Sequence, residues 1–192
     1  MSIADRRVGR LRRPERLLGL IVALLVGAAI VIFVAVSQAD DEPPTATPGD
    51  LPAGATLAEV VRVSDGDTIL VRVDGATERV RYVGVDAPEI AHPEDGIAAE
   101  CWGEEASAAN AALVEGGVVA IERDVSDRDR FGRLLRHVWA SDASGWFLVS
   151  ERLVRDGAVE ARSYPPDTGR DGTLDGAERV ARAARTGLWG AC

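Results

Sequence analysis

Residues 55–86 decide the fold, and they read ATLAEVVRVSDGDTILVRVDGATERVRYVGVD. Apolar and polar residues alternate in three runs, as they do in strands with one buried face. Asp65-Gly66 and Asp74-Gly75 separate the runs, and both pairs suit the positive backbone angles of tight hairpins. We therefore expect an antiparallel meander of three strands, whose alternating apolar residues are Val61 and Val63, then Ile69, Val71 and Val73, then Val83 and Val85.

The sequence after this meander predicts further strands and helices. Residues 103–115 are rich in alanine, begin with acids and stop at Gly116-Gly117, which favours a helix. We also expect strands at 118–123 and 133–140, and helices near 147–156 and 174–186 that end at Gly157 and Gly187. Five strands with a helix after the third predict an α+β fold: a five-stranded OB-type barrel with about three helices, spanning residues 55–192.

The N-terminal part carries a different signal. Residues 17–36 (LLGLIVALLVGAAIVIFVAV) have no charge and are long enough to cross a hydrocarbon core of about 30 Å. Arginines precede this run and acids follow it, so the positive-inside rule predicts a cytoplasmic tail at 1–16, a transmembrane segment at 17–39 and an extracytoplasmic remainder. Residues 40–54 predict a disordered, acidic, Pro-rich linker. The alternative is a signal peptide cleaved after Ser37-Gln38-Ala39, which would leave a secreted protein.

The charge balance limits how the domain could meet nucleic acid. The formal charge is −9, and after Ala39 there are 16 arginines against 29 acids. Such a domain repels polyanions at long range, which excludes binding through a general basic surface. Action on nucleic acid would require a local site, with a bound cation to attract the phosphate.

Candidate ligands for such a cation are two aspartates near the ends of neighbouring predicted strands. Asp67 lies in the turn Asp65-Gly66-Asp67-Thr68, and Asp86 opens the segment Asp86-Ala87-Pro88-Glu89. Carboxylates and backbone carbonyls are the oxygen ligands that Ca²⁺ accepts, and two carboxylates predict weak binding. By itself, the first segment is more typical of an ordinary hairpin turn.

Three further residues carry candidate chemistry. Glu89 could orient or deprotonate a water, although a solvated loop acid is the alternative. Arg81 and Arg133 could each offer a planar fork of donors to a phosphate. The alternative is that both are exposed strand residues in surface ion pairs, since every basic residue of this chain is an arginine.

Taken together, these segments resemble the staphylococcal nuclease family from about residue 55 to residue 189. That family shares the Asp-Gly-Asp-Thr turn, the Arg-led strand ending in Asp-x-Pro-Glu and a later Gly-Arg. The resemblance implies hydrolysis of DNA and RNA at the 5′ oxygen to leave 3′-phosphates. We expect the domain to be monomeric, although the sequence leaves the oligomeric state open. It implies that Ca²⁺ is held by Asp67, Asp86 and the carbonyl of Ala87 near Asp65, that Glu89 acts on water, and that Arg81 and Arg133 grip the phosphate.

The sequence departs from the family pattern in two places. A tyrosine just before the later Gly-Arg is Phe131 here, and of two tyrosines at the nucleotide rim only Tyr164 remains, with Arg162 at the other position. Losing hydroxyls and a stacking ring should affect nucleotide binding more than phosphate chemistry. A catalytically silent OB-fold module that binds nucleic acid at the cell surface is the alternative function.

The two cysteines, Cys101 and Cys192, fit a disulfide in an oxidising compartment. It would join the start of the first predicted helix to the C-terminus, and the chain-entropy model gives it about 4–5 kcal/mol. Free thiols and an intermolecular bond are the alternatives. A zinc site is disfavoured, because His92 and His137 lie in unrelated contexts, and His137 is expected to be structural.

Overall fold

The computed structural model describes residues 51–91, 93, 96 and 98–192. The predicted cytoplasmic tail (1–16), the predicted transmembrane segment (17–39) and most of the predicted linker (40–54) lie outside these residues. Within the described part of the chain, no helix combines the length and the apolar character that a membrane crossing needs.

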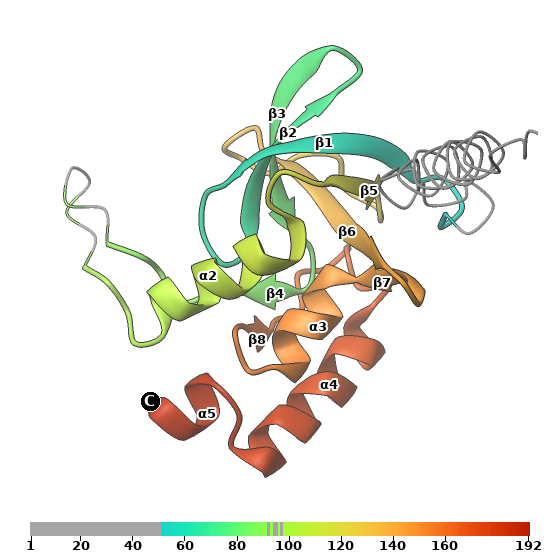
Figure 1. Ribbon diagram of the computed structural model, residues 1–192. Helices are drawn as coiled ribbons and strands as arrows, with labels where there is room; N and C mark the ends of the chain where they lie inside the picture. Colours follow the sequence, from blue (N-terminus) through green and yellow to red (C-terminus); the bar gives the residue numbers. More distant parts are fainter. Residues whose placement is uncertain (1–50, 92, 94–95, 97) are drawn as a thin grey trace, which may run out of the picture. The chain divides into compact units, whose positions relative to one another are not determined.

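Five strands form a closed barrel, as the sequence predicts (Figure 1). They run in the order β3-β2-β1-β5-β6, each pair antiparallel, and β6 closes the barrel by pairing with β3 in parallel. Their bounds are β1 Thr56–Val63, β2 Thr68–Val73, β3 Ala76–Tyr82, β5 Val118–Glu122 and β6 Leu134–Asp142. The interior is filled by fully buried apolar residues such as Ile69, Val71, Val80, Val119 and Val138.

The two predicted hairpin turns differ from each other. Asp74 (φ 49°) and Gly75 (φ 78°) both have positive backbone angles, as predicted. Gly66 has no positive φ, so that part of the prediction for Asp65-Gly66 is wrong. Gly66 is instead a packing residue, because a Cβ atom there would lie 2.7 Å from the Cβ of Ala87 and 2.9 Å from the Cβ of Ala106.

The third strand lies earlier than its predicted apolar residues. β3 ends at Tyr82, so Val83 follows it, and Val85 belongs to the short strand β4 (Val85–Asp86), which pairs with β8 (Glu160–Ala161). Gly84 separates the two with a φ of 83°. This turn redirects the chain away from the barrel and carries Asp86 toward the side where β8 lies.

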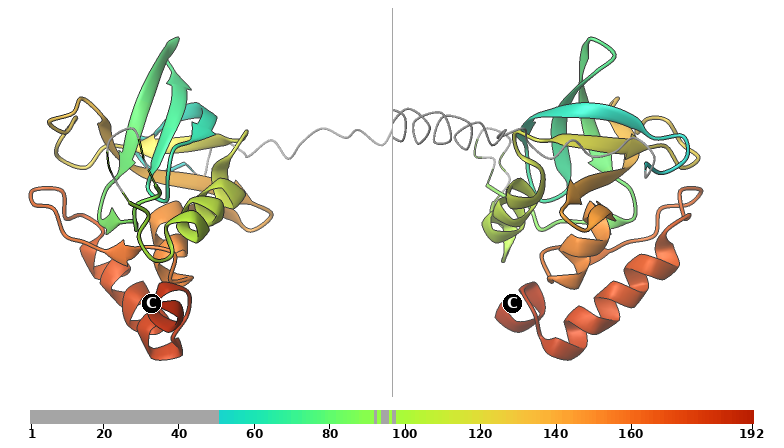
Figure 2. Two further views of the ribbon diagram at one scale, coloured as in Figure 1. Left: turned by 90° about the vertical axis from the view of Figure 1, so that its left-hand side faces the viewer. Right: turned by 45° about the vertical axis from the view of Figure 1, so that its right-hand side comes forward.

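The helices lie beside and below the barrel in Figure 1, and Figure 2 shows the same arrangement from two other sides. They are α2 Gly103–Val114, α3 Val149–Arg155, α4 Asp171–Ala184 and α5 Leu188–Ala191. The predicted helix 147–156 starts later, because β7 (Gly145–Leu148) pairs with β6 as a strand. The predicted helix 174–186 starts and ends earlier, and it stops where Arg185 takes a left-handed conformation.

A disulfide joins the loop before α2 to the end of the chain. The Cys101 and Cys192 sulfurs are 2.06 Å apart and their Cα atoms are 6.1 Å apart, which confirms the predicted pair. It closes a loop of 91 residues that contains both α3 and α4.

Candidate functional site

The turn between β1 and β2 holds the first predicted metal ligand in a network of hydrogen bonds. Asp65 Oδ1 accepts from the backbone N–H of Asp67 at 3.0 Å, and Thr68 Oγ1 donates to Asp67 Oδ1 at 3.1 Å. The N–H of Ala87 donates to Asp67 Oδ2 at 2.7 Å. The Asp67 side chain is therefore fixed by its own turn and by the segment after β4.

Burial gives Asp67 an unusual ionisation. The residue is only 5% exposed. Burial raises the pKa of its carboxyl to about 7, in spite of the opposing charge of Arg81 and with a further rise from Asp65. A cation placed beside such a buried carboxylate stabilises its charged form.

A buried asparagine of α2, which was not predicted from the sequence, holds this turn by a hydrogen bond. Asn110 of α2 donates through Nδ2 to the carbonyl of Asp65 at 2.9 Å and accepts from the hydroxyl of Tyr82 at 2.9 Å. Asn110 is completely buried, and Tyr82 is almost completely buried. Its signal in the sequence is one amide within the alanine-rich run 103–115, on a helix face that otherwise packs against the barrel.

Arg81 brings the two predicted metal ligands together. Its Nη1 forms an ion pair with Asp67 Oδ2, and its Nη2 lies 2.9 Å from Asp86 Oδ1. The other carboxylate oxygen of Asp86 lies 3.2 Å from Nη2 of Arg162. The pairing of Thr68 with Arg81 between β2 and β3 explains this arrangement, because it sets Arg81 across from the residue next to Asp67.

Arg133 is held by an acid from its own loop. Its Nε lies 2.6 Å from Asp129 Oδ2, and its backbone N–H donates to Asp129 Oδ1 at 2.9 Å, as does that of Phe131. Although burial acts to raise it, these bonds hold the pKa of Asp129 below its ordinary value. The sequence by itself assigns no role to Asp129.

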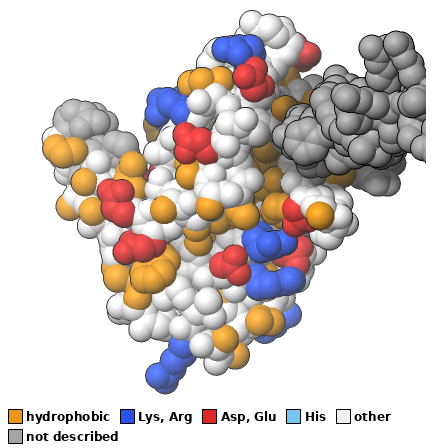
Figure 3. All heavy atoms as spheres, viewed as in Figure 1, with side chains coloured by type: hydrophobic (Ala, Val, Ile, Leu, Met, Phe, Trp, Pro, Cys, Tyr) orange, Lys and Arg blue, Asp and Glu red, His pale blue; other side chains and the backbone are white. Residues whose placement is uncertain are grey.

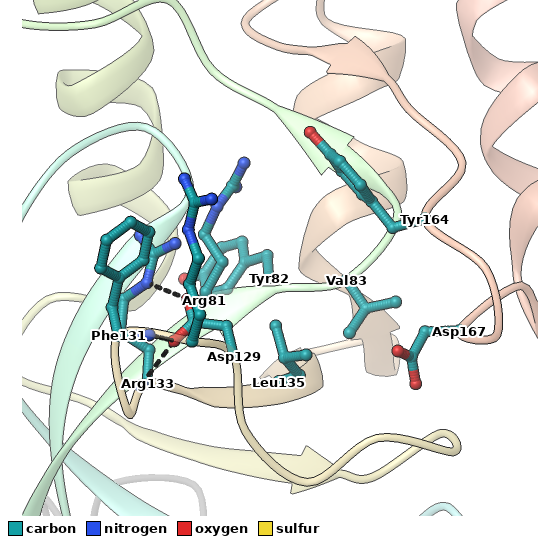
Figure 4. A pocket seen from close by; sticks show the side chains of 10 residues that line it. Arg81, Tyr82, Val83, Asp129, Phe131, Arg133, Leu135, Tyr164 and Asp167 are labelled. Carbon is teal, nitrogen blue, oxygen red and sulfur yellow. Dashed lines mark hydrogen bonds and ion pairs between the residues drawn. The ribbon is translucent and has the colours of Figure 1, made fainter.

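A cavity of about 400 Å³ lies between Arg81 and Arg133 on one side and the predicted nucleotide rim, with Phe131 and Tyr164, on the other (Figure 4). Phe131 and Tyr164 are 67% and 43% exposed. The guanidinium carbons of Arg130 and Arg133 lie 4.6 Å and 5.6 Å from the centre of the Phe131 ring. The cavity is lined by Arg81, Tyr82, Val83, Asp129, Arg130, Phe131, Arg133, Leu135, Tyr164 and Asp167.

The structure thus brings most of the predicted residues to one place. Asp65, Asp67, Ala87 and Asp86 are connected through hydrogen bonds and through Arg81, which also lines the cavity with Arg133 and Tyr164. Glu89 is exposed on the segment that follows Asp86 and is not among the residues that line this cavity.

The surface seen in Figure 3 agrees with the charge argument from the sequence. On the face viewed in Figure 3, arginine and acidic side chains are interspersed and do not gather into one basic surface. Among the residues that the structure describes, no group of three or more His, Cys, Asp or Glu side chains could hold a metal ion. Any cation here would therefore depend on two carboxylates and on groups of other kinds.

Comparison with known proteins connects this geometry to one family. A family model described as "Staphylococcal nuclease homologue" matches residues 79–191. The chain is 30% identical to the thermonuclease of Staphylococcus intermedius over 166 residues, covering 86% of this chain and 94% of that protein. It is 29% identical to the thermonuclease of Staphylococcus hyicus, covering 86% and 95%. Endonuclease YncB of Bacillus subtilis is 35% identical over 130 residues, covering 67% of this chain and 59% of that protein.

Proposed function

The chain belongs to the family of staphylococcal nuclease homologues, and from that premise we propose that it is a calcium-dependent nuclease. Its substrates are DNA and RNA, which it cleaves at the 5′ oxygen of the phosphodiester to leave 3′-phosphates. The observation that carries this proposal is the position of Arg81, which pairs with Asp67 and Asp86 and lines the same cavity as Arg133. The relatives are named as enzymes, so the silent binding module is not favoured.

The residues present fit a hard cation. The carboxylates of Asp67 and Asp86 both face a single positive group, the guanidinium of Arg81, so both are directed at one cationic position. Carboxylate oxygens are the ligands that Ca²⁺ prefers. Asp67 and Asp86 would hold the ion, with the carbonyl of Ala87 beside them. Bound calcium would supply positive charge against the phosphate, which the acidic domain cannot otherwise attract.

Each protein group then has a distinct task in hydrolysis. Glu89 takes a proton from the attacking water or holds that water in line. Arg81 and Arg133 donate to the phosphate oxygens and stabilise the charge that builds up as water attacks phosphorus. The bond from water oxygen to phosphorus forms and the bond to the 5′ oxygen breaks. The 5′ oxygen takes up a proton from solvent and leaves as a hydroxyl, and the phosphate stays on the 3′ side.

A nuclease assay on the full chain in mild detergent tests this proposal. We expect cleavage of single-stranded DNA and RNA with Ca²⁺, loss of cleavage with a calcium chelator, and products that release phosphate on treatment with a 3′-phosphatase. Glu89→Gln should lower kcat/KM by about 10²–10⁴-fold, the range for general acid-base catalysis. Glu104→Gln, which removes an exposed acid from the first turn of α2, is the matched control.

The outcomes separate the function from its mechanism. A folded wild-type chain that cleaves nothing at any Ca²⁺ concentration would contradict the function. Equal cleavage by the wild type and by Glu89→Gln would leave the nuclease in place and remove Glu89 from its mechanism.

We place the catalytic domain outside the cytoplasm, tethered by residues 17–39. The uncharged run between a basic and an acidic flank supports this location. The Cys101–Cys192 disulfide is also typical of oxidising compartments. Added protease should digest the domain on intact spheroplasts while a cytoplasmic marker survives, and detection of the domain only in the medium would indicate cleavage and secretion instead.

A further inference from the structure

The backbone of Glu89 is fastened to Glu100 by a reciprocal pair of hydrogen bonds. The N–H of Glu89 donates to Glu100 Oε2 at 3.1 Å, and the N–H of Glu100 donates to the carbonyl of Glu89 at 2.9 Å. These two bonds close the segment between the residues at its base. The side chain and the backbone of Glu100 therefore both hold the backbone of Glu89.

The first residue of α2 packs against the same backbone. A Cβ atom at Gly103 would collide with the carbonyl oxygen of Glu89 and lie 2.9 Å from its carbonyl carbon. The N–H of Gly103 donates to the carbonyl of Glu100 at 3.2 Å. The start of the helix thus leaves the Glu89 backbone no room to shift toward it.

Between Glu100 and Gly103 lies Cys101, whose disulfide partner is the terminal residue Cys192. The far end of this bridge is anchored, because the N–H of Leu188 donates to the carbonyl of Gly157 at 2.9 Å and the N–H of Cys192 to that of Leu188 at 2.9 Å. Leu188 is buried. The bridge therefore ties the base of the Glu89 segment to the end of α3 through α5.

We propose that Glu100 and the Cys101–Cys192 disulfide are positioning groups for Glu89, so that both affect the turnover of the site. This inference rests on the proposed nuclease function and on Glu89 acting on water. Glu89 is exposed on a loop, where burial does little to fix it. A displacement of about 1 Å can reduce turnover about 10²-fold, so the fastening at the base of the loop matters for rate.

Two variants of Glu100 on the full chain test the first half of the proposal. Glu100→Ala removes the acceptor for the Glu89 N–H, and we expect kcat to fall about 10-fold or more with KM within about twofold, because only the alignment of water is lost. Glu100→Gln keeps an acceptor oxygen and should retain kcat within about threefold. Equal kcat in the wild type, Glu100→Gln and Glu100→Ala would overturn the proposal.

The disulfide is tested by the double variant Cys101→Ser/Cys192→Ser and by reduction and reoxidation of the wild type. We expect kcat to fall about 10-fold and to return on reoxidation, at a temperature where melting curves show the chain folded. Val119→Ala, a buried change in β5, lowers stability without touching this bridge and should leave kcat unchanged. A drop in kcat that only tracks the loss of melting temperature, in Val119→Ala as well, would assign the disulfide to stability alone.

A double-mutant cycle with Glu89→Gln separates positioning from other causes. If Glu100 acts through Glu89, then Glu100→Ala has no further effect on kcat once Glu89→Gln is present. An equal fall in both backgrounds would contradict the proposal. A wild type without nuclease activity would instead contradict the proposed function. A Glu89→Gln variant as active as the wild type would remove Glu89 from the mechanism, and the positioning proposal with it.

Discussion

The two halves of the candidate site are built differently. The carboxylate half (Asp65, Asp67, Arg81 and Asp86) is half-buried to buried, with Asp67 only 5% exposed, and hydrogen bonds join it to the segment after β4 and to α2. The rim half (Arg130, Phe131, Arg162 and Tyr164) is exposed, with Phe131 67% exposed. Both departures from the family pattern, Phe131 and Arg162, lie in the rim. The predicted metal ligands therefore lie in a hydrogen-bonded part of the fold, whereas both departures from the family pattern lie on exposed segments.

Removal of the buried charge should give the largest effect. Asp67→Asn keeps the shape of the side chain and removes a metal ligand, so we expect kcat to fall about 10³-fold or more. The same change should raise the melting temperature in chelator by about 2–6 °C, because a carboxylate whose pKa is raised by burial no longer opposes folding. Nuclease kinetics and thermal melts measure the two effects, and a loss of stability would show that the ion pair with Arg81 outweighs burial.

Substitutions in the rim should change KM and leave kcat nearly unchanged. Phe131→Ala removes an exposed ring beside the cavity, and we expect KM to rise about 10-fold with kcat nearly unchanged, because base stacking contributes about 1–3 kcal/mol. Phe131→Tyr, which restores the family hydroxyl, is the control and should bind at least as well as the wild type. A fall in kcat with unchanged KM in Phe131→Ala would break the division between the two halves.

A smaller effect is expected where the halves meet. Arg162 lies 3.2 Å from Asp86, and both side chains are partly exposed, so their interaction is worth about 0.2–1 kcal/mol. Arg162→Tyr should therefore strengthen Ca²⁺ binding about 2–5-fold in calorimetry without substrate. Arg179→Gln removes the same charge from α4 and controls for net charge. Equal affinities in all three proteins would show that Arg162 does not compete for Asp86.

The smallest expected effect is on the pH dependence of the free energy of unfolding, through His137 of β6. Burial lowers the pKa of His137, although the nearby acids Asp124 and Glu122 act to raise it and Arg170 acts to lower it further. His137 is also near Asp167. The Asp167 side chain accepts hydrogen bonds from the backbone N–H groups of Val125 and Ser126. A lowered folded pKa means that the unfolded chain takes up the proton first. The contribution of neutral, buried His137 to the free energy of unfolding is therefore complete above pH 6.5. It is lost as the pH falls from 6.5 to the pKa of His137 in the folded chain.

Urea unfolding between pH 5 and pH 8 measures this contribution as the difference between the wild type and His137→Gln, which does not titrate at this position. Asp67, whose pKa is about 7, titrates in both proteins and cancels in that difference. Nuclease KM should change little over the same range, because His137 does not line the cavity. A stability curve that is identical in the wild type and the variant would show that His137 carries no such linkage.

Local sequence was sufficient for the barrel and insufficient for several boundaries. The alternation in β2 and the Asp74-Gly75 turn predicted the meander correctly. The predicted apolar face of β1 is wrong, because Ala58 and Val60 are buried whereas Val61 is 42% exposed, and the register shifts between Val60 and Arg62. Residues 146–149 (WFLV) are apolar throughout, which suits a helix or a strand, and only the pairing of Phe147 with Ala140 decides for a strand. Gly66 suits a hairpin by composition, whereas in the fold its small size is needed against Ala87 and Ala106.

The candidate site was likewise predictable in part. Each of its residues has an ordinary alternative when taken singly, and their order and spacing supplied the resemblance. Asn110 and Asp129 went without a role, because their partners Asp65 and Arg133 are brought to them by the packing of α2 and by the shape of the loop before β6.

The sequence by itself determined the alternation that makes the strands, the turns that reverse them, and the kinds of chemical group that reach the loops. These depend on residues close together in the chain. Tertiary structure alone decided which charges meet: the register of Thr68 against Arg81 sets one guanidinium between Asp67 and Asp86, and the docking of α5 brings Cys192 to Cys101 across 91 residues. Such contacts join distant positions, so packing of the whole barrel and its helices fixes them, and no local pattern does.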